Sequence, residues 1–252
     1  MTAASSGTAR WLVRRRWRPD ASVGLYCFAH AGGSLGEYLR WSDDLPGLQL
    51  WGVHLPGRTS RSGEPPFTRM APLVEALVTE IRFARPFVFF GHSLGALVAF
   101  EVARELRRRD REQPVRLVLS SCPAPPIARA GLPLHALPDA GLLAEIERRW
   151  GALSAELRTD PDLLAHTLAC HRADLELLET YRYRPGEPLD VPITALAGTG
   201  ETSAARVRGW AAHTRAPLTV RLLPGGHFYF RERRDEALRA LRDAVTGGPP
   251  SP

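Results

Sequence analysis

The protein has 252 residues, of which 44% are hydrophobic and 24% charged, as in an ordinary globular protein long enough to bury a sizeable core. No apolar run is long enough to span a bilayer. The arginines near the start are not followed by an apolar stretch of signal-peptide length. We therefore expect no contact with membranes and a cytoplasmic location. Cys27, Cys122 and Cys170 are scattered without metal-ligand spacing, which predicts buried thiols in a reducing compartment and no metal site.

The formal net charge of +6 comes from arginine alone, because the chain contains no lysine. A basic surface can attract nucleic acid or an acidic protein. Replacement of every lysine by arginine also follows from the nucleotide composition of a GC-rich genome, and we favour that origin. No nucleic-acid-binding motif is present, and the run Arg107-Arg108-Arg109 ends a predicted helix, where positive charge favours the helix dipole. Nucleic acid is therefore not an expected partner.

The predicted elements alternate between strands and helices. In chain order they are a loose lead-in over residues 1 to about 20, strands at Val23–Phe28 and Leu48–Val53, a helix at Met70–Arg82, a strand at Phe87–Phe90, a helix at Leu94–Arg109, strands at Val115–Leu119, Ile193–Ala197 and Leu218–Leu223, and a helix at Glu232–Ala244. Most of these strands are apolar throughout, which is typical of a parallel sheet covered on both faces. The sequence therefore predicts an α/β fold with a mostly parallel central sheet flanked by helices.

The interval from about residue 123 to 188 interrupts this alternation. It holds proline-rich turns and helical stretches at Asp139–Trp150 and Asp160–Tyr181, without a convincing strand. Such a helical block predicts an insertion over the strand ends, a lid; the alternative is that these helices pack in the main layer. We see no internal repeat, so we expect one domain over residues 1–252 with a lid insertion at about 123–188.

The pentapeptide Gly91-His92-Ser93-Leu94-Gly95 lies between an apolar strand and a helix. This setting is typical of the nucleophile turn of an α/β-hydrolase, in which a strained backbone exposes the serine and the two glycines admit neighbouring backbone. The N–H of Leu94, at the start of the helix, can stabilise developing negative charge. We predict that Ser93 is a nucleophile; the alternative is a glycine-rich turn with a solvated serine.

A second oxyanion donor is expected from an earlier loop. His30-Ala31-Gly32-Gly33 follows the strand predicted at Val23–Phe28 and resembles the glycine-rich oxyanion loops of esterases. We predict that the N–H of Ala31 is this donor. Without its strand context, the pair of glycines would indicate only a turn.

The remaining triad members follow from chain order, which in this fold is serine, acid, histidine. His227 follows the last strand, whereas the other histidines precede the acid strand, belong to the insertion or fall in an apparent helix; His92 is interpreted as structural. The acid should follow the strand Ile193–Ala197, where Glu201 is the only carboxylate. A glutamate needs a more retracted backbone than an aspartate. The alternative is that Glu201 is a solvated loop residue.

These residues resemble the type II thioesterases, the stand-alone editing enzymes of polyketide and nonribosomal peptide synthesis. The resemblance covers about residues 10 to 245. It rests on Phe28–Gly33 with Tyr38 and Trp41, Leu55-Pro56-Gly57-Arg58, the pentapeptide around Ser93, Arg172-Ala173-Asp174 with Glu179-Thr180-Tyr181, and Pro224-Gly225-Gly226-His227-Phe228. The family usually carries an aspartate three residues beyond a glycine after the acid strand; here that position, counted from Gly198, is Glu201.

The resemblance implies hydrolysis of an acyl thioester held on the phosphopantetheine arm of an acyl or peptidyl carrier protein, through an acyl-enzyme on Ser93. It implies no cofactor of the enzyme's own, because the phosphopantetheine belongs to the partner, and it matches the insertion to the family's helical lid. Carrier proteins are generally acidic, so an arginine-rich surface would aid encounter. Three alternatives stay open: an esterase of free small esters, a thioesterase that releases finished product, and a catalytically weak carrier-binding protein. We expect a monomer.

Overall fold

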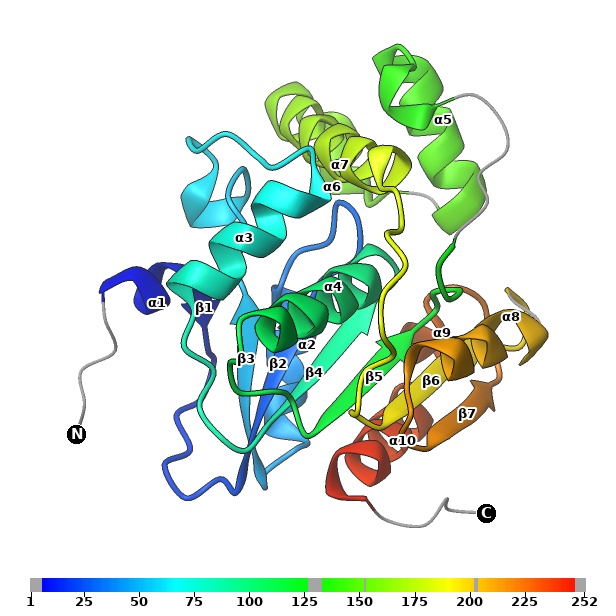
Figure 1. Ribbon diagram of the computed structural model, residues 1–252. Coiled ribbons are helices and arrows are strands. Elements are labelled where there is room, and N and C mark those ends of the chain that lie inside the picture. Colours follow the sequence, from blue (N-terminus) through cyan, green and yellow to red (C-terminus); the bar gives the residue numbers. More distant parts are fainter. Residues whose placement is uncertain (1–5, 127–132, 152, 202–203, 248–252) are drawn as a thin grey trace.

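A computed structural model describes residues 6–126, 133–151, 153–201 and 204–247. Within these residues one seven-stranded sheet runs through the molecule in the order β1-β3-β2-β4-β5-β6-β7 (Figure 1). The strands are β1 (Leu12–Val13), β2 (Val23–Phe28), β3 (Leu48–Val53), β4 (Phe87–His92), β5 (Arg116–Ser120), β6 (Ile193–Gly198) and β7 (Leu218–Leu223). All neighbouring pairs are parallel except β1 with β3. The predicted α/β class with a mostly parallel sheet is confirmed.

Helices lie on both faces of this sheet and beyond one of its ends. They are α1 (Ser6–Trp11), α2 (Gly36–Leu39), α3 (Met70–Glu80), α4 (Leu94–Arg108), α5 (Asp139–Trp150), α6 (Ala155–Thr159), α7 (Pro161–Thr180), α8 (Ala204–Arg208), α9 (Tyr229–Glu232) and α10 (Arg234–Thr246). Short 3-10 helices occupy Arg40–Asp43, Thr59–Arg61, Leu134–Ala136 and Gly209–His213. In Figure 1, α3 and α4 lie in front of the sheet and α10 lies below and behind it.

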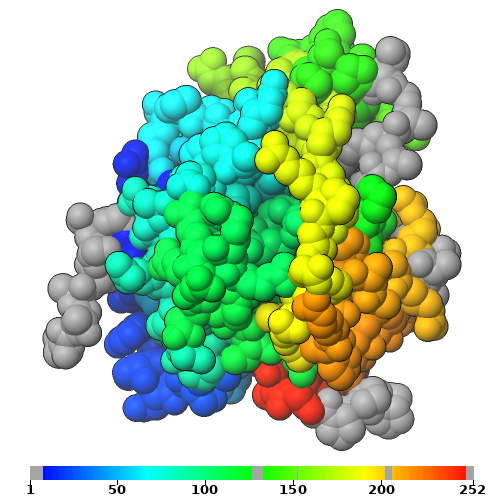
Figure 2. All heavy atoms as spheres, in the orientation of Figure 1, coloured from blue at the N-terminus to red at the C-terminus, as the bar shows by residue number. Residues whose placement is uncertain are grey.

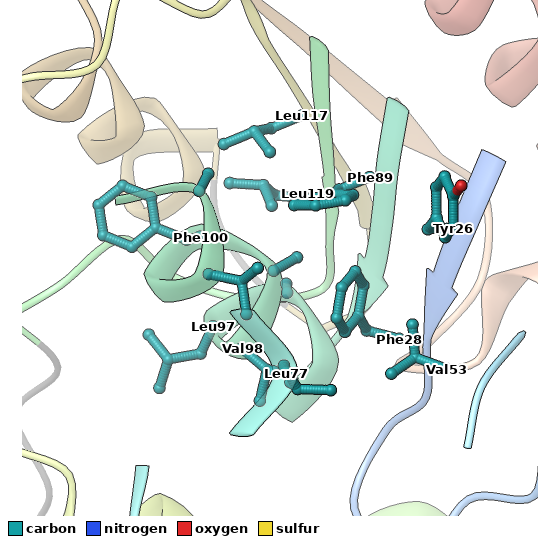
Figure 3. Packing of buried hydrophobic residues seen from close by; sticks show 14 of the residues in the cluster. Tyr26, Phe28, Val53, Leu77, Phe89, Leu97, Val98, Phe100, Leu117 and Leu119 are labelled. Carbon is teal, nitrogen blue, oxygen red and sulfur yellow. The ribbon is translucent and has the colours of Figure 1, made fainter. Parts of the chain in front are cut away.

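The apolar strands divide their side chains between two cores, because successive residues of a strand point to opposite faces. On one face Phe28 and Phe89 pack against α3 and α4 (Figure 3). On the other face Leu25 and Phe90 pack with Tyr38 of α2 and with α10. Burial on both faces explains why these strands read as continuous apolar runs.

The predicted loose lead-in over residues 1 to about 20 is wrong for residues 6–13, whereas residues 14–20 form neither helix nor strand. Helix α1 leads into β1, the edge strand of the sheet, which pairs antiparallel with β3. Trp11 and Leu12 are buried, at 5% and 8% exposure, and the carbonyl of Trp11 accepts a hydrogen bond from the N–H of His54 at 2.7 Å. A strand of two residues set among arginines has no detectable periodicity, so only its pairing with β3 defines it.

Other elements differ from prediction mainly at their ends. Strand β4 continues past Phe90 to His92, which pairs with Ser120 of β5, because ladder hydrogen bonds define a strand end and hydropathy does not. Helix α3 stops at Glu80, since Ile81 is extended and fully buried. The predicted closing helix Glu232–Ala244 is α10, which begins only at Arg234: Glu232 ends the separate helix α9, and Arg233 between them has a φ of −127° and a ψ of 54°, which are not helical.

The interval 123–188 contains helices and no strand where it is described; residues 127–132 and 152 lie outside the described part. It holds α5, α6 and α7, and the side chain of Asp160 caps α7 by accepting a hydrogen bond from the N–H of Leu163 at 3.0 Å. Helices α5 and α7 share a small apolar cluster of their own around Leu142, Ile146 and Leu168, separate from the two cores on the sheet. In α6, by contrast, no residue belongs to this cluster. In Figure 1 the three helices form a layer beyond one end of the sheet.

The chain that leaves α7 returns to the sheet across α4. Figure 2 shows this segment (yellow) running down beside the helix (green), and Arg104 and Arg107 of α4 donate hydrogen bonds of 2.6 Å to the carbonyls of Arg184 and Pro188. These arginines of α4 therefore bind the segment that follows α7 and hold it against the helix. No helix in the described ranges is both long and apolar enough to cross a membrane.

At Gly95 the helix α4 lies against the end of β2, and replacement of this glycine tests that contact. A Cβ at this position would overlap the carbonyl oxygen of Phe28 at the end of β2. Alanine is the better helix former by about 1 kcal/mol, but we expect the clash to prevail, so that Gly95→Ala lowers the free energy of unfolding by about 2 kcal/mol or more. Urea unfolding measures this. Gly47→Ala, where a Cβ meets nothing within 4 Å, should change little; equal effects would contradict the prediction.

Candidate active site

Ser93 lies at the junction of β4 and α4, in the predicted strand–turn–helix setting. Its backbone has φ 55° and ψ −117°, a conformation that a residue with a side chain adopts only where the surrounding structure imposes it. Two backbone hydrogen bonds impose it here: the N–H of Ser93 donates to the carbonyl of Ser120 at 2.8 Å, and its carbonyl accepts from the N–H of Ala96 at 3.1 Å. The turn directs the Ser93 side chain into a cavity of about 220 Å³.

The loop after β2 lines the same cavity. Gly33 donates its N–H to the carbonyl of His30 at 2.9 Å, and Gly32, at φ 67°, donates its N–H to the carboxylate of Asp174 at 2.7 Å. Within the described residues the N–H groups of Ala31 and Leu94 have no acceptor. These are the two predicted oxyanion donors, and both belong to segments that meet at Ser93.

His227 and Glu201 meet across the ends of β7 and β6. His227 lines the cavity with Ser93, and its Nδ1 forms a short hydrogen bond with the Glu201 carboxylate. The two loops approach closely because Gly198 has no side chain: a Cβ there would overlap the carbonyl oxygen of Gly226. The structure therefore brings together Ser93, His227 and Ala31 around one cavity and adds Glu201 behind the histidine, while their catalytic roles stay predictions.

The helical layer forms part of the cavity lining, and most of the side chains it contributes are apolar. These are Ile146, Trp150, Leu153, Leu157 and Leu178, and they are joined by the polar side chains of Thr167 and His171. At the rim, the guanidinium of Arg231 lies 3.9 Å from the ring centre of Phe228 and makes two hydrogen bonds of 2.8 Å to the carboxylate of Glu37. A group bound to Ser93 would therefore contact aliphatic and aromatic side chains inside the cavity and the ion pair of Arg231 and Glu37 at its rim.

Two buried histidines, His92 and His30, lie beside the residues that line the site. His92 is fully buried; its Nδ1 lies 2.8 Å from the hydroxyl of Ser120, which in turn lies 2.8 Å from that of Tyr229. Nδ1 of His30 lies 2.6 Å from the hydroxyl of Tyr38. Burial lowers the pKa of both imidazoles well below the usual value, and positive charge on neighbouring side chains lowers it further. The interpretation of His92 as structural agrees with this environment.

These lowered pKa values predict that the protein loses stability in mild acid. In the unfolded chain both histidines bind a proton near pH 6.5, whereas in the folded protein they stay neutral to lower pH. The unfolded state therefore binds more protons below about pH 6.5, and each histidine costs up to about 1.4 kcal/mol of stability per pH unit as the pH falls. Above pH 7 both states are neutral and the contribution is constant.

Urea unfolding at pH 7.5, 6.0 and 5.0 measures this dependence. His92→Asn removes one titrating group and retains a polar side chain beside Ser120. Its stability should fall less steeply with pH than that of the wild type, by about 1.4 kcal/mol per pH unit below pH 6. Parallel curves for the two proteins would show that His92 takes up its proton equally in both states.

Sequence reasoning missed two side chains of α7 that reach the site. His171 was set aside with the other histidines of the insertion, yet it lines the cavity and its ring occupies the space that a Cβ of Gly32 would need. Asp174 carries the hydrogen bond to Gly32 and an ion pair to Arg58 of 2.7 Å. Arg58 and Asp174 were part of the family resemblance, but one sequence contains no signal that they are partners.

The structure also bears on the cysteines and on metal binding. All three cysteines lie in the described part of the chain, are buried and form no disulfide, as predicted. Among the described residues, no group of three or more His, Cys, Asp or Glu side chains is arranged to hold a metal ion.

Comparison with known proteins gives consistent matches over nearly the whole chain. The sequence matches the thioesterase domain family over residues 24–245. It is 38% identical to thioesterase PikA5 of Streptomyces venezuelae, over 95% of this chain and 88% of that protein, and 32% identical to the gramicidin S biosynthesis protein GrsT of Aneurinibacillus migulanus, over 92% of each. The solved structure of the type II thioesterase BorB from the borrelidin biosynthetic cluster matches with a TM-score of 0.82 and 33% identity, covering 94% of this chain and 96% of that one.

Proposed function

Because the chain belongs to the thioesterase family, we propose that it hydrolyses acyl thioesters carried on the phosphopantetheine arm of acyl or peptidyl carrier proteins. The pathway context is the editing of polyketide or nonribosomal peptide synthesis, where the enzyme would remove aberrant or stalled units. Support comes from near-full-length similarity to PikA5, GrsT and BorB, whose names place them in thioester hydrolysis or antibiotic biosynthesis. The observation that carries the chemistry is that His227 lines one cavity with Ser93 and is paired, on its Nδ1, with Glu201.

In the proposed mechanism, Ser93 Oγ attacks the thioester carbonyl carbon while Nε2 of His227 accepts the hydroxyl proton. The carbonyl oxygen becomes an oxyanion held by the N–H groups of Ala31 and Leu94. The intermediate collapses, the C–S bond breaks, and the proton from His227 goes to the leaving thiolate. Water then attacks the acyl-enzyme with His227 again as base, which releases the carboxylic acid and regenerates Ser93. Glu201 orients the imidazole throughout through Nδ1.

The helices α5, α6 and α7 act in this proposal as the lid of a single domain. Their apolar side chains line the cavity opposite Ser93, where an acyl chain would extend from the carbonyl carbon. Burial of such a chain is favourable by about 0.8 kcal/mol for each CH₂ group. The shape of this wall would therefore select the acyl group, while the triad would act on any thioester carbonyl presented to it.

The arginine excess supports an acidic partner at the same end of the molecule. Arg206 and Arg208 are exposed on α8, which follows the loop that carries Glu201, and neither forms an ion pair with another described residue. Positive charge near the cavity would speed the encounter with an acidic carrier protein. On this basis kcat/KM for a carrier-bound substrate should fall as NaCl is raised, and kcat/KM for a small thioester should not.

One experiment tests the proposal against two of its alternatives, the esterase of small esters and the carrier-binding protein. The same acyl group is offered on a carrier protein, as its N-acetylcysteamine thioester and as a simple oxygen ester, and kcat/KM is measured for each. We expect the carrier-bound thioester to be preferred over the ester by about 100-fold or more, since only it can use binding energy remote from the carbonyl. Preference for the ester would identify an esterase of small esters, and binding of the carrier without turnover would identify a carrier-binding protein.

A further inference from the structure

We propose that helix α7 sets the oxyanion hole: the buried pair of Arg58 and Asp174 holds the Gly32 N–H so that the Ala31 N–H faces the carbonyl attacked by Ser93. Arg58 and Asp174 are thus positioning residues, which act through the backbone of the loop and do not touch the substrate. The inference rests on the proposed function only in requiring that Ser93 forms an oxyanion, from whatever acyl substrate.

The carboxylate of Asp174 joins three segments that are far apart in the sequence. One oxygen accepts the Gly32 N–H at 2.7 Å and the other accepts Nη2 of Arg58 at 2.7 Å. Arg58 also donates Nη1 to the carbonyl of Gly33 at 3.4 Å. The side chains of Asp174 and Arg58 are only 3% and 10% exposed, so each of these contacts replaces hydration that the buried charges have lost.

The hydrogen bonds of the loop explain why the free donor is Ala31. Of the consecutive N–H groups in the loop, that of Gly33 is taken by the His30 carbonyl and that of Gly32 by Asp174. Without the Asp174 carboxylate, the partly buried Gly32 N–H would lose its protein acceptor, which costs up to about 1–3 kcal/mol. Rotation of the adjoining peptide would relieve this cost and turn the Ala31 N–H away from Ser93.

A second contact from α7 restrains the loop on its other side. The ring of His171, one turn before Asp174, fills the space beside Gly32 where any Cβ would overlap it. Nδ1 of His171 donates to the carbonyl of Thr167 at 2.9 Å, which orients the ring. Cys170 in the same turn donates its Sγ hydrogen to the carbonyl of Gly57 at 3.0 Å, so the segment that carries Arg58 is held against the same helix.

Because α7 also lines the cavity through Thr167 and Leu178, the helix that contacts a bound acyl group is the helix that sets the Ala31 donor. Displacement of α7 by a poorly fitting acyl chain would therefore lower the rate of the chemical step as well as the binding affinity. In this arrangement the acyl group is selected through kcat and not through KM alone.

The test compares two conservative changes on α7. Asp174→Asn removes the charge that holds Arg58 and weakens the acceptor for Gly32. Glu179→Gln is the matched control: Glu179 lies on the same helix and its carboxylate also accepts backbone N–H groups, from Leu134 at 2.9 Å and His135 at 3.3 Å, but it does not contact the loop. With an acyl N-acetylcysteamine thioester, we expect kcat to fall by about 10- to 100-fold in Asp174→Asn with KM changed less than about 3-fold, and Glu179→Gln to keep kcat within about 3-fold.

A second readout follows the oxyanion directly. A fluorophosphonate places its phosphonyl oxygen where the oxyanion forms, so its rate of reaction with Ser93 should fall in Asp174→Asn by a factor similar to that in kcat. Labelling needs no carrier protein. If the wild type is labelled but does not hydrolyse carrier-bound thioesters, the proposed function fails while the labelling rates still decide the role of Asp174.

Unchanged kcat and labelling in Asp174→Asn would overturn the inference, and so would an equal loss in Glu179→Gln. If Asp174→Asn does not unfold cooperatively in urea, Arg58→Lys replaces it. Lysine keeps the charge but cannot reach Asp174 and the Gly33 carbonyl together, so kcat should fall with little change in KM. Full activity of Arg58→Lys would equally overturn the inference.

Discussion

Replacing Ser93 with alanine is expected to reduce kcat by about five to six orders of magnitude, because no acyl-enzyme can form. The Ser93 side chain makes no hydrogen bond with another described residue. Alanine, like serine, would have to adopt the φ of 55°, so the backbone strain is the same in both proteins. The free energy of unfolding should therefore change by less than about 0.5 kcal/mol. Loss of activity without loss of stability would separate a chemical role from a structural one.

Single-turnover hydrolysis of an acyl thioester measures the loss, and mass spectrometry of the quenched reaction locates the acyl group. Wild-type protein should carry the acyl group on the peptide that contains Ser93, and Ser93→Ala should carry none. Ser93→Cys, which keeps a nucleophile at the same strained position, should still acylate. Residual turnover above about 1% in Ser93→Ala would assign the attack to water or to another side chain.

Replacing Glu201 with glutamine is expected to lower kcat by about 10²- to 10⁴-fold with a smaller change in KM. The carboxylate bonds to Nδ1 of His227 and so keeps the proton on that nitrogen, which leaves Nε2 free to accept the proton of Ser93. An amide can donate to Nδ1 and favour the opposite tautomer. Glu201→Asp, one methylene shorter, should retain more activity than Glu201→Gln, because its charge persists although its reach falls short.

Glu232, at the end of α9, provides a matched control. Its carboxylate lies against the same glycine-rich segment, 3.5 Å from the N–H of Gly226, and makes no contact with His227 among the hydrogen bonds of the described residues. Glu232→Gln should keep kcat within about 3-fold of the wild type. If Glu201→Gln retains more than about a tenth of kcat, or if Glu232→Gln loses as much, the triad acid lies elsewhere or is dispensable.

Reliable predictions came from local features of the sequence. The strand Leu218–Leu223 and the helix Asp139–Trp150 have the predicted bounds, since apolar periodicity and flanking turn residues specify elements over a few residues. The turn at Ser93 was predicted for the same reason: two glycines, a strand and a helix within one short segment describe its geometry. Glu201 was predicted from chain order alone, and its contact with His227 depends on how closely Gly198 and Gly226 approach.

The sequence by itself thus determined the α/β alternation, the strained serine turn and the order of the candidate triad, because these depend on neighbouring residues. Only the tertiary structure decided that β1 adds to the sheet, that His171 enters the cavity, and that Arg58 pairs with Asp174 across 116 positions. Each of these depends on which surfaces meet when helices pack over the strand ends. One sequence contains the partners of such contacts but not their pairing, since burial and geometry exist only in the folded chain.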